Sequence, residues 1–337
     1  MYKLIIRPIL FLFDSEKVHN FTLWFVSKFT FIYPLAKIFC GSRKKEEINI
    51  NGLVFRNRLG LAAGFDKNAI ALRFWDALGF SHAEIGTVTP LAQEGNPKPR
   101  LFRLRKDEAV INRMGFNNKG ADFILENILK AKKYLSKDFV IGVNIGKNKN
   151  TPNENAAGDY LICFKKLYDA AGYFTINISS PNTKGLRELQ EEENLKNLLS
   201  KIKNENAVLA SGKREKNIFV KIAPDVNDEQ IKVIYNTVRE CGITGIILTN
   251  TTVTRKNLKE NINEDGGLSG KPLKNLANET LNKFHRLNTY NKLILVGAGG
   301  VFSKRDYETK LNNGAALVQV YTGMIYEGPK LVKKILN

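Results

Sequence analysis

Residues 173–183 read Tyr-Phe-Thr-Ile-Asn-Ile-Ser-Ser-Pro-Asn-Thr, and the interpretation of the whole chain depends on this stretch. Its first half is a largely apolar run that predicts a buried strand ending near Ile178. Its second half contains hydroxyl and amide side chains and a proline, so regular structure cannot continue. Taken alone, the segment is an ordinary Ser-Pro-Asn turn. At the end of a strand in a parallel barrel, it would lie where active sites form.

Seven other stretches share this pattern of a short apolar strand followed by a polar or glycine-rich loop. Together with residues 173–178, the predicted strands are 59–63, 83–86, 140–145, 218–222, 245–248, 293–296 and 316–320. Helices are predicted between and after them, near 68–79, 117–135, 155–171, 191–206, 228–241, 273–287, 303–313 and 328–336. Eight strands that alternate with eight helices predict an α/β fold, a closed parallel (β/α)8 TIM barrel.

A doubly wound sheet is the alternative α/β fold. It would more typically carry a G-x-G-x-x-G motif after its first strand. Residues 62–67 follow the first predicted strand here, and they read Ala-Ala-Gly-Phe-Asp-Lys. The length of 337 residues is normal for one α/β barrel, so the sequence favours the barrel.

The C-terminal strand ends of a barrel converge on one mouth, so loops far apart in sequence become neighbours. Lys221 lies inside the apolar strand Val220-Lys221-Ile222. An unpaired buried charge is costly, so this lysine predicts a nearby anion or a polar cavity. A lysine that simply reaches solvent is the alternative. The other strand ends carry mostly glycines, amides and hydroxyls: Gly64, Thr87, Asn144, Asn177, Thr249–Thr252, Gly297–Gly300 and Tyr321–Gly323.

The glycine-rich ends of the seventh and eighth strands predict a phosphate site, although tight turns alone would also explain them. Glycines let backbone N–H groups close on phosphate oxygens, and helix N-termini add favourable partial charge. No carboxylate pair, histidine base or metal cluster stands at the predicted mouth. These features suit a planar anionic ligand with a cofactor that supplies the reactivity, and a flavin phosphate is the natural candidate.

The composition argues against several other classes of protein. Cys40, Cys163 and Cys241 lie far apart, which argues against a disulfide framework and against a zinc site. The net charge of +19 is spread along the chain without an arginine-rich block, so nucleic acid is not an expected partner. Genomic bias toward lysine, an anionic lipid surface and attraction of an acidic small molecule are three explanations of the charge.

The first 40 residues are unusually aromatic, with 10 of the chain's 33 aromatic residues (20 Phe, 11 Tyr and 2 Trp). Charged residues interrupt them throughout, so neither a membrane span nor a signal peptide is predicted. We expect residues 1–41 to form an amphipathic helical hairpin that packs on the main domain or lies in a bilayer interface. A linker at 41–47 would precede a catalytic domain at 48–337. A helix capped by Asp14 or Ser15 would place apolar side chains at helical spacing: Val18, Phe21, Phe25 and Phe29.

Taken together, these motifs resemble the class 2, quinone-dependent dihydroorotate dehydrogenases over nearly the whole chain. The resemblance implies oxidation of (S)-dihydroorotate to orotate in pyrimidine biosynthesis, with FMN as the first electron acceptor and a membrane quinone as the final one. The matching segments are 61–68, 84–90, 97–104, 111–118, 142–148, 177–183, 185–187, 221–224, 249–252, 266–270, 297–300 and 317–321.

The resemblance also implies a role for each matching residue. Ser180 would be the catalytic base, and Thr183 is a candidate for a proton relay through water. The quinone tunnel would be bordered by His19, Arg103 and Tyr321. FMN would contact Ala63, Gly64, Phe65, Asp66, Lys67, Thr87, Asn144, Asn177, Lys221, Thr249, Gly270, Gly300, Tyr321 and Thr322. Dihydroorotate or orotate would contact Lys67, Asn112, Arg113, Met114, Gly115, Phe116, Asn177, Asn182, Asn250 and Thr251.

The nearest alternative is the class 1 dihydroorotate dehydrogenases, which are soluble and use fumarate or NAD. Relatives of that class have cysteine at the position of Ser180 and no N-terminal hairpin, so both features favour class 2. A flavin-free barrel lyase or isomerase would be colourless. A non-catalytic basic protein gives no reason for polar residues at all eight strand ends. Because the sequence shows neither a transit peptide nor a membrane span, we expect a peripheral protein on an anionic membrane surface, the cytoplasmic face of a bacterial inner membrane.

Overall fold

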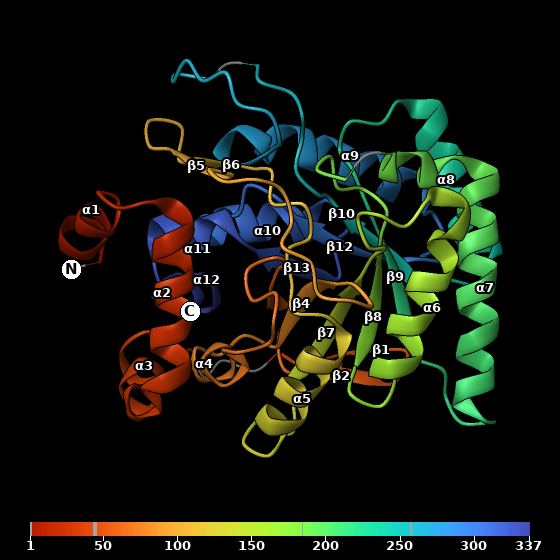
Figure 1. The fold of residues 1–337 in the computed structure, drawn as a ribbon, viewed down its shortest axis with the longest axis horizontal. Helices are drawn as coiled ribbons and strands as arrows, with labels where there is room; N and C mark the ends of the chain where they lie inside the picture. The colour runs from red at the N-terminus through yellow and green to blue at the C-terminus, as the bar shows by residue number, and fades with distance from the viewer. Residues whose placement is uncertain (1, 43–45, 184, 257) are drawn as a thin grey trace.

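The computed structural model describes residues 2–42, 46–183, 185–256 and 258–337, and its centre is a closed barrel of eight parallel strands (Figure 1). The predicted TIM barrel is therefore confirmed, with strand boundaries that differ by a few residues from those expected. Around the barrel the strands are β3 (Leu59–Leu61), β4 (His82–Val88), β7 (Val140–Ile145), β8 (Tyr173–Asn177), β9 (Asn217–Ile222), β10 (Gly245–Leu248), β12 (Ile294–Ala298) and β13 (Leu317–Val320).

The eight predicted helices are also present around the barrel. The first is shorter than expected, because the Asp66 carboxylate accepts hydrogen bonds from the N–H groups of Ile70 and Ala71, both at 2.9 Å, and Ala69 has a φ of 57°. A short helix that was not predicted, α11 (Thr322–Glu327), follows β13. The others are α4 (Leu72–Ala77), α5 (Ala121–Lys132), α6 (Ala156–Leu167), α7 (Glu192–Ala210), α8 (Asp228–Glu240), α9 (Lys274–Leu287), α10 (Lys304–Asn312) and α12 (Leu331–Leu336).

Two small antiparallel sheets were not predicted, and they lie at opposite ends of the barrel. β1 (Ile48–Ile50) pairs with β2 (Leu53–Phe55), and buried Ile50 and Phe55 share a core cluster with residues at the N-terminal strand ends. β5 (Leu101–Leu104), β6 (Ala109–Asn112) and β11 (Gly267–Gly270) form the second sheet, whose residues reach the cavity at the mouth. These strands have only three or four residues each, too short to show a clear alternation in sequence.

The N-terminal helices lie against one side of the barrel, next to α11 and α12 (Figure 1). They comprise a π-helix at Tyr2–Ile6, α1 (Arg7–Leu10), α2 (Ser15–Lys28), a 3-10 turn at Thr30–Ile32 and α3 (Tyr33–Phe39). Asp14 caps α2, since its carboxylate accepts from the N–H of Lys17 at 2.8 Å. Residues 43–45 of the predicted linker lie outside the described residues.

Only one side of the N-terminal segment packs on the barrel. Leu23 and Val26 of α2 are buried in the main core, and Glu16 makes a buried ion pair with Arg100. The opposite side leaves large apolar side chains exposed to solvent. Packing on the main domain therefore explains the apolar residues on one side of the segment but not those on the other. No helix in the described part of the chain has the length and apolar character needed to cross a membrane. The most exposed of the large apolar side chains in the N-terminal segment are Leu4 at 84%, Leu12 at 74%, Phe31 at 72% and Phe39 at 61%.

Candidate active site

A cavity opens at the mouth of the barrel, where the C-terminal ends of the strands meet. It contains about 1000 Å³ of empty space, including space open to solvent. All of the barrel strands except β7 contribute a lining residue from the strand or from the loop that follows it. Most of the polar groups in the lining are amides, hydroxyls and two lysines: Lys67, Thr87, Asn112, Asn177, Ser180, Asn182, Lys221, Thr249, Asn250, Thr251, Ser269, Gln319 and Thr322.

Three polar side chains on neighbouring strands form the wall of the cavity and the layer beneath it. The Asn177 amide donates to Thr87 Oγ1 at 2.8 Å and to Asn144 Oδ1 at 3.2 Å. Thr87 Oγ1 in turn donates to Asn144 Oδ1 at 2.6 Å. Asn144 itself is fully buried and does not line the cavity. It therefore fixes the orientation of the two side chains that do.

A buried carboxylate lies below this layer, inside the barrel. Glu84 on β4 is fully buried, and its Oε1 accepts from Asn144 Nδ2 at 2.8 Å. Lys221 Nζ lies 3.7 Å from the same oxygen. The predicted anion beside Lys221 is therefore present, and the lysine also faces the cavity. The second carboxylate oxygen has three further donors, namely Gln319 Nε2 at 2.8 Å, Tyr173 OH at 3.2 Å and Thr175 Oγ1 at 3.2 Å.

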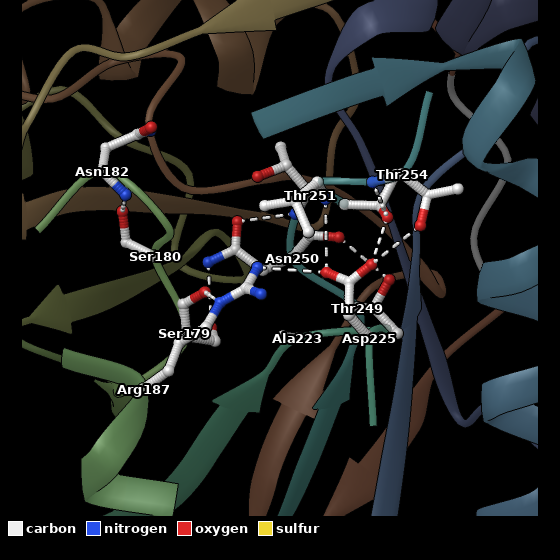
Figure 2. Close-up of polar contacts among 12 residues, drawn as sticks. Ser179, Ser180, Asn182, Arg187, Ala223, Asp225, Thr249, Asn250, Thr251 and Thr254 are labelled. Carbon is white, nitrogen blue, oxygen red and sulfur yellow. Dashed lines mark hydrogen bonds and ion pairs between the residues drawn. The ribbon is translucent and has the colours of Figure 1, made fainter. Parts of the chain in front are cut away.

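The segment after β8 brings Ser180 to the cavity. Ser180 is buried, and its Oγ accepts from the N–H of Asn182 at 3.3 Å. The Asn182 side chain extends across the cavity to donate to Asn112 Oδ1 at 3.1 Å. The preceding residue is held more firmly, because Asn250 Nδ2 donates to Ser179 Oγ at 2.9 Å (Figure 2). The Ser180 hydroxyl itself therefore has few protein contacts and can serve a ligand.

Lys67 enters the cavity from the loop after β3. Its Nζ lies 2.8 Å from Met114 Sδ and donates a hydrogen bond to Asn117 Oδ1. Burial and, to a smaller extent, the positive charge of Arg100 together lower the pKa of Lys67 to about 7, while Glu16 opposes the shift. An anion bound next to Lys67 would favour its protonated form.

Glycines form another part of the cavity lining. Gly300 has a φ of 75°, and a Cβ atom there would lie 2.5 Å from Lys274 Cα. Gly270 has a φ of 102°, and a Cβ atom there would lie 2.4 Å from the Glu108 carbonyl oxygen. Only glycine fits these backbones. Thr322 adds a hydroxyl, which donates to Ser269 Oγ at 2.8 Å, and the resulting shelf of backbone and hydroxyl groups suits a phosphate.

A row of aromatic rings leads from the cavity to α2. The Tyr321 ring lines the cavity and lies 5.2 Å from the Phe65 ring, which lies 5.3 Å from the His19 ring. Burial and, to a smaller extent, the charge of Lys67 together lower the pKa of His19 to about 4. The imidazole is therefore neutral at physiological pH. Arg103 stacks over Phe11 at 4.4 Å and donates to the Leu10 carbonyl oxygen at 3.1 Å, so it holds the end of α1.

Known proteins resemble this chain along its entire length. The family model "Dihydroorotate dehydrogenase" matches residues 46–337. A protein of Christiangramia forsetii named dihydroorotate dehydrogenase (quinone) is 49% identical, and the match covers 99% of this chain and 97% of that protein. One of the same name from Idiomarina loihiensis is 46% identical, with 100% and 99% covered. The chain belongs to the dihydroorotate dehydrogenase family.

Solved structures agree with this family assignment. The crystal structure of dihydroorotate dehydrogenase from Eimeria tenella in complex with ferulenol has a TM-score of 0.88 and 36% identity, and covers 96% of this chain and 90% of that one. The ligand-free form has a TM-score of 0.87 and 37% identity, with 96% and 93% covered. Dihydroorotate dehydrogenases are flavoenzymes, and the named relatives are of the quinone-dependent kind, as the class 2 resemblance implied.

The dihydroorotate dehydrogenase fold brings most of the sequence-predicted site residues to one cavity, but not all of them. The Asp66 carboxylate turns away to bind Ile70, Ala71 and Trp75, so that it stabilises the loop. Arg113 pairs with Glu264 on the outer side of the β6 strand end. The predicted residues that the cavity lining does not include are Phe65, Asp66, Arg113, Asn144, Thr183, His19 and Arg103.

Three functional candidates of this dihydroorotate dehydrogenase were missed in the sequence. Glu84 interrupts the apolar run Ala83-Glu84-Ile85, and the argument applied to Lys221 would have identified it. Gln319 likewise interrupts the apolar strand β13 and lines the cavity. Ser269 has no such signal, because its strand β11 reads Gly-Leu-Ser-Gly and resembles a loop.

Proposed function

We propose that this chain oxidises (S)-dihydroorotate to orotate in pyrimidine biosynthesis, with FMN as its cofactor and a membrane quinone as the final electron acceptor. The observation that supports this most is the position of Ser180. It is the one buried hydroxyl in its loop that faces a cavity surrounded by asparagine amides and lysines, in the part of the chain that the structure describes. The names of the full-length relatives support the same substrate and acceptor.

The cavity suits FMN on chemical grounds. The glycine backbones at Gly270 and Gly300 and the Thr322 hydroxyl offer room and donors for a phosphate. Lys221 would lie near the ring edge where reduction adds negative charge, and the Thr87 and Asn177 side chains would hold the ring polar groups. When bound, FMN would accept a hydride from the substrate and deliver electrons to the quinone.

Dihydroorotate would lie between Ser180 and the asparagines of the cavity. Asn112, Asn177, Asn182 and Asn250 provide amides for the polar edges of a pyrimidine ring. Lys67 provides a cation for an anionic ligand. The substrate would therefore be held on several sides, with its C5 proton directed toward the Ser180 hydroxyl.

Ser180 would remove the C5 proton of dihydroorotate. A serine hydroxyl is a poor base, so the proton needs an outlet, and water must be excluded. Ser180 is only 5% exposed, and Thr183 is buried three residues further along the loop, where a hydroxyl could relay the proton through a water molecule. The loop from residue 181 to about residue 193 would close over the substrate, and residue 184 within it lies outside the described residues.

The exposed apolar side of the N-terminal segment supports peripheral binding to an anionic membrane. Side chains such as Phe31 and Phe39 would enter the acyl boundary, and the chain's excess of lysine would attract acidic headgroups. The quinone would reach the flavin from this side, along His19 and Tyr321. The cytoplasmic face of a bacterial inner membrane is the proposed location.

An anaerobic titration tests this function. Purified protein is expected to carry a flavin whose absorbance bleaches on addition of dihydroorotate. A quinone analogue should then restore the absorbance, and fumarate should not. Protein that bound no flavin, or a bound flavin that dihydroorotate failed to bleach, would contradict the proposal. Reoxidation by fumarate alone would instead support the class 1 reaction.

A further inference from the structure

Two charged side chains outside the cavity join the loop of Ser180 to the loop after β10. Arg187 Nη2 donates to Asp225 Oδ2 at 3.1 Å (Figure 2). Arg187 follows the Ser180 loop in sequence, and Asp225 lies beyond the end of β9. Neither residue lines the cavity. Any effect of this pair on the reaction must therefore act through the residues it holds.

The arginine end of the pair holds the backbone next to Ser180. Arg187 Nε donates to the Ser179 carbonyl oxygen at 3.3 Å. That carbonyl belongs to the peptide bond that leads into Ser180. Gln190 holds the same turn from behind, since its Nε2 donates to the Arg187 carbonyl oxygen at 3.4 Å and its Oε1 accepts from the Ala223 N–H at 3.3 Å.

The aspartate end holds the segment that follows the proposed substrate residues Asn250 and Thr251. Asp225 Oδ1 accepts hydrogen bonds from the hydroxyl of Thr252 and, at 3.4 Å, from that of Thr254. Asp225 Oδ2 accepts from the Val253 N–H at 3.3 Å. One carboxylate therefore fixes three consecutive residues and the arginine, and Figure 2 shows it beside Arg187 and Thr254. Hydrogen bonds to an ionised acceptor are the stronger kind, so this arrangement is stiff.

From these contacts we infer that Arg187 and Asp225 form a latch that positions the Ser180 hydroxyl against the substrate. The inference rests on the proposed function, because it assigns the pair to the step in which Ser180 removes a proton. Both are positioning residues. Among the described residues, the one hydrogen bond that orients the Ser180 Oγ is the 3.3 Å contact from the Asn182 N–H, so its location depends on the backbone that Arg187 holds. A base displaced by about 1 Å can lose about 100-fold in rate.

Arg187→Gln and Asp225→Asn test the latch, with Arg239→Gln as the matched control. Arg239 makes an exposed ion pair with Glu240 on α8, so its loss should change nothing. In each latch variant we expect flavin reduction at saturating dihydroorotate to slow by about 10- to 100-fold. Orotate affinity, measured from the flavin spectrum, should stay within about threefold, because the ligand contacts remain. Backbone amides of residues 179–190 should exchange hydrogen faster, while the barrel strands should not.

Three further measurements separate positioning from a general loss of structure. The isotope effect with C5-deuterated dihydroorotate should increase in the latch variants, because proton removal becomes slower. The double variant should be no slower than the slower single one, since both substitutions break one unit. Arg187→Lys keeps a cation beside Asp225 but cannot also reach the Ser179 carbonyl, so it should be intermediate in rate. It also serves as the folded variant if Arg187→Gln is unstable.

The results distinguish the latch from the proposed function. Latch variants that reduce flavin within about twofold of wild type at saturation, or that lose only orotate affinity, would overturn the latch. Unchanged hydrogen exchange in residues 179–190 would overturn it as well. Wild-type protein whose flavin dihydroorotate fails to reduce would overturn the proposed function instead, and the latch with it as a positioning device.

Discussion

The barrel interior and the N-terminal segment depart from the usual distribution of side chains in opposite directions. Inside the barrel, Glu84, Asn144 and Lys221 are buried although they are charged or polar. On the N-terminal segment, Leu4 and Phe31 are exposed although they are large and apolar. Most folded domains avoid both arrangements. In this molecule the first surrounds the cavity, and the second forms the surface proposed to meet a membrane.

The two regions differ in how their unusually placed side chains are stabilised. The buried polar groups satisfy one another, since Glu84 alone accepts from four hydrogen-bond donors besides its contact with Lys221. Burial costs little where such groups satisfy one another, and Gln319 Oε1 is the atom of this network that lacks a hydrogen-bond partner among the described residues. The exposed apolar groups have no such partners within the described chain. They are stabilised only if another phase covers them, so the interior is largely satisfied by its own contacts and the exposed surface is not.

The largest expected effect comes from removing one polar atom of the interior. Ser180→Ala should lower the rate of flavin reduction by dihydroorotate by about 100- to 10,000-fold, the usual contribution of a positioned base. Flavin content should stay unchanged, because the hydroxyl is not among the groups proposed to hold FMN. Stopped-flow absorbance measures the rate. Near-normal reduction would remove Ser180 from the role of base.

The exterior is tested by removing apolar surface. Phe31→Ser combined with Phe39→Ser should weaken binding to anionic vesicles by about 100-fold or more, because burying each of the two side chains stabilises by about 1.5–3 kcal/mol. Vesicle co-sedimentation measures the effect, and flavin reduction by dihydroorotate should not change. Val208→Ser with Tyr290→Ser is the control, since these side chains are equally exposed but lie outside the N-terminal segment. Equal loss in the control pair would show that the surface as a whole binds lipid.

The same contrast explains what the sequence could predict. The barrel could be predicted because each buried strand appears in the sequence as a short apolar run, and eight such runs alternate with helical segments. The cavity residues at strand ends follow too, since Asn177 and Lys221 pair in register on β8 and β9 and both reach the mouth. Glu84 was identifiable by the rule used for Lys221.

Contacts between segments that are distant in sequence could not be predicted from the local sequence pattern. The β5–β6–β11 sheet places Asn112 and Ser269 at the cavity. Its strands are short, however, and β11 lies more than 150 residues after β6 in the sequence. The resemblance implied that Asp66 contacts FMN, whereas its carboxylate accepts a hydrogen bond from the Ala71 N–H within its own loop. Which side of the N-terminal segment packs on the barrel was likewise decided by tertiary contacts such as Glu16 with Arg100.

The boundary between the two regions gives a pH-dependent prediction, because the charge of Glu16 on α2 affects the pKa of Lys67 in the cavity. Its pKa is lowered to about 7 in the free protein. The protonated lysine attracts anionic orotate, so affinity should be highest below pH 7 and should fall by about tenfold as the pH rises to about 8 or above, if binding raises the pKa by about one unit. Flavin spectral titration measures this.

The control for this prediction is Lys67→Met, whose affinity should be low at every pH. Unfolding cannot mimic the effect. The pKa of Lys67 is lower in the folded protein than in the unfolded chain, so this group makes the fold more stable as the pH rises from about 7 toward its ordinary value. A pH-independent affinity in the wild type would show that Lys67 stays charged throughout.

The smallest expected effect tests whether the interior network matters for its charge as well as its shape. Glu84→Gln should keep the network, because the introduced amide can donate to Gln319 Oε1, which has no hydrogen-bond partner among the described residues. Lys221 would then lack its neutralising carboxylate at 3.7 Å. Its positive charge would stabilise the negative charge that reduction adds to a bound flavin, so the midpoint potential should rise by about 20 mV, where about 30 mV is tenfold for a two-electron couple.

Thr175→Val provides the matched control for Glu84→Gln, because it removes one donor to the same carboxylate without a change of charge. It should cost about 1 kcal/mol of unfolding free energy and leave the potential within a few millivolts. Equal shifts in both variants would show that packing, and not charge, sets the potential. A rise confined to Glu84→Gln would mean that the polar interior does more than fill the barrel, because Glu84 would tune the cofactor through Lys221 without itself touching the cavity.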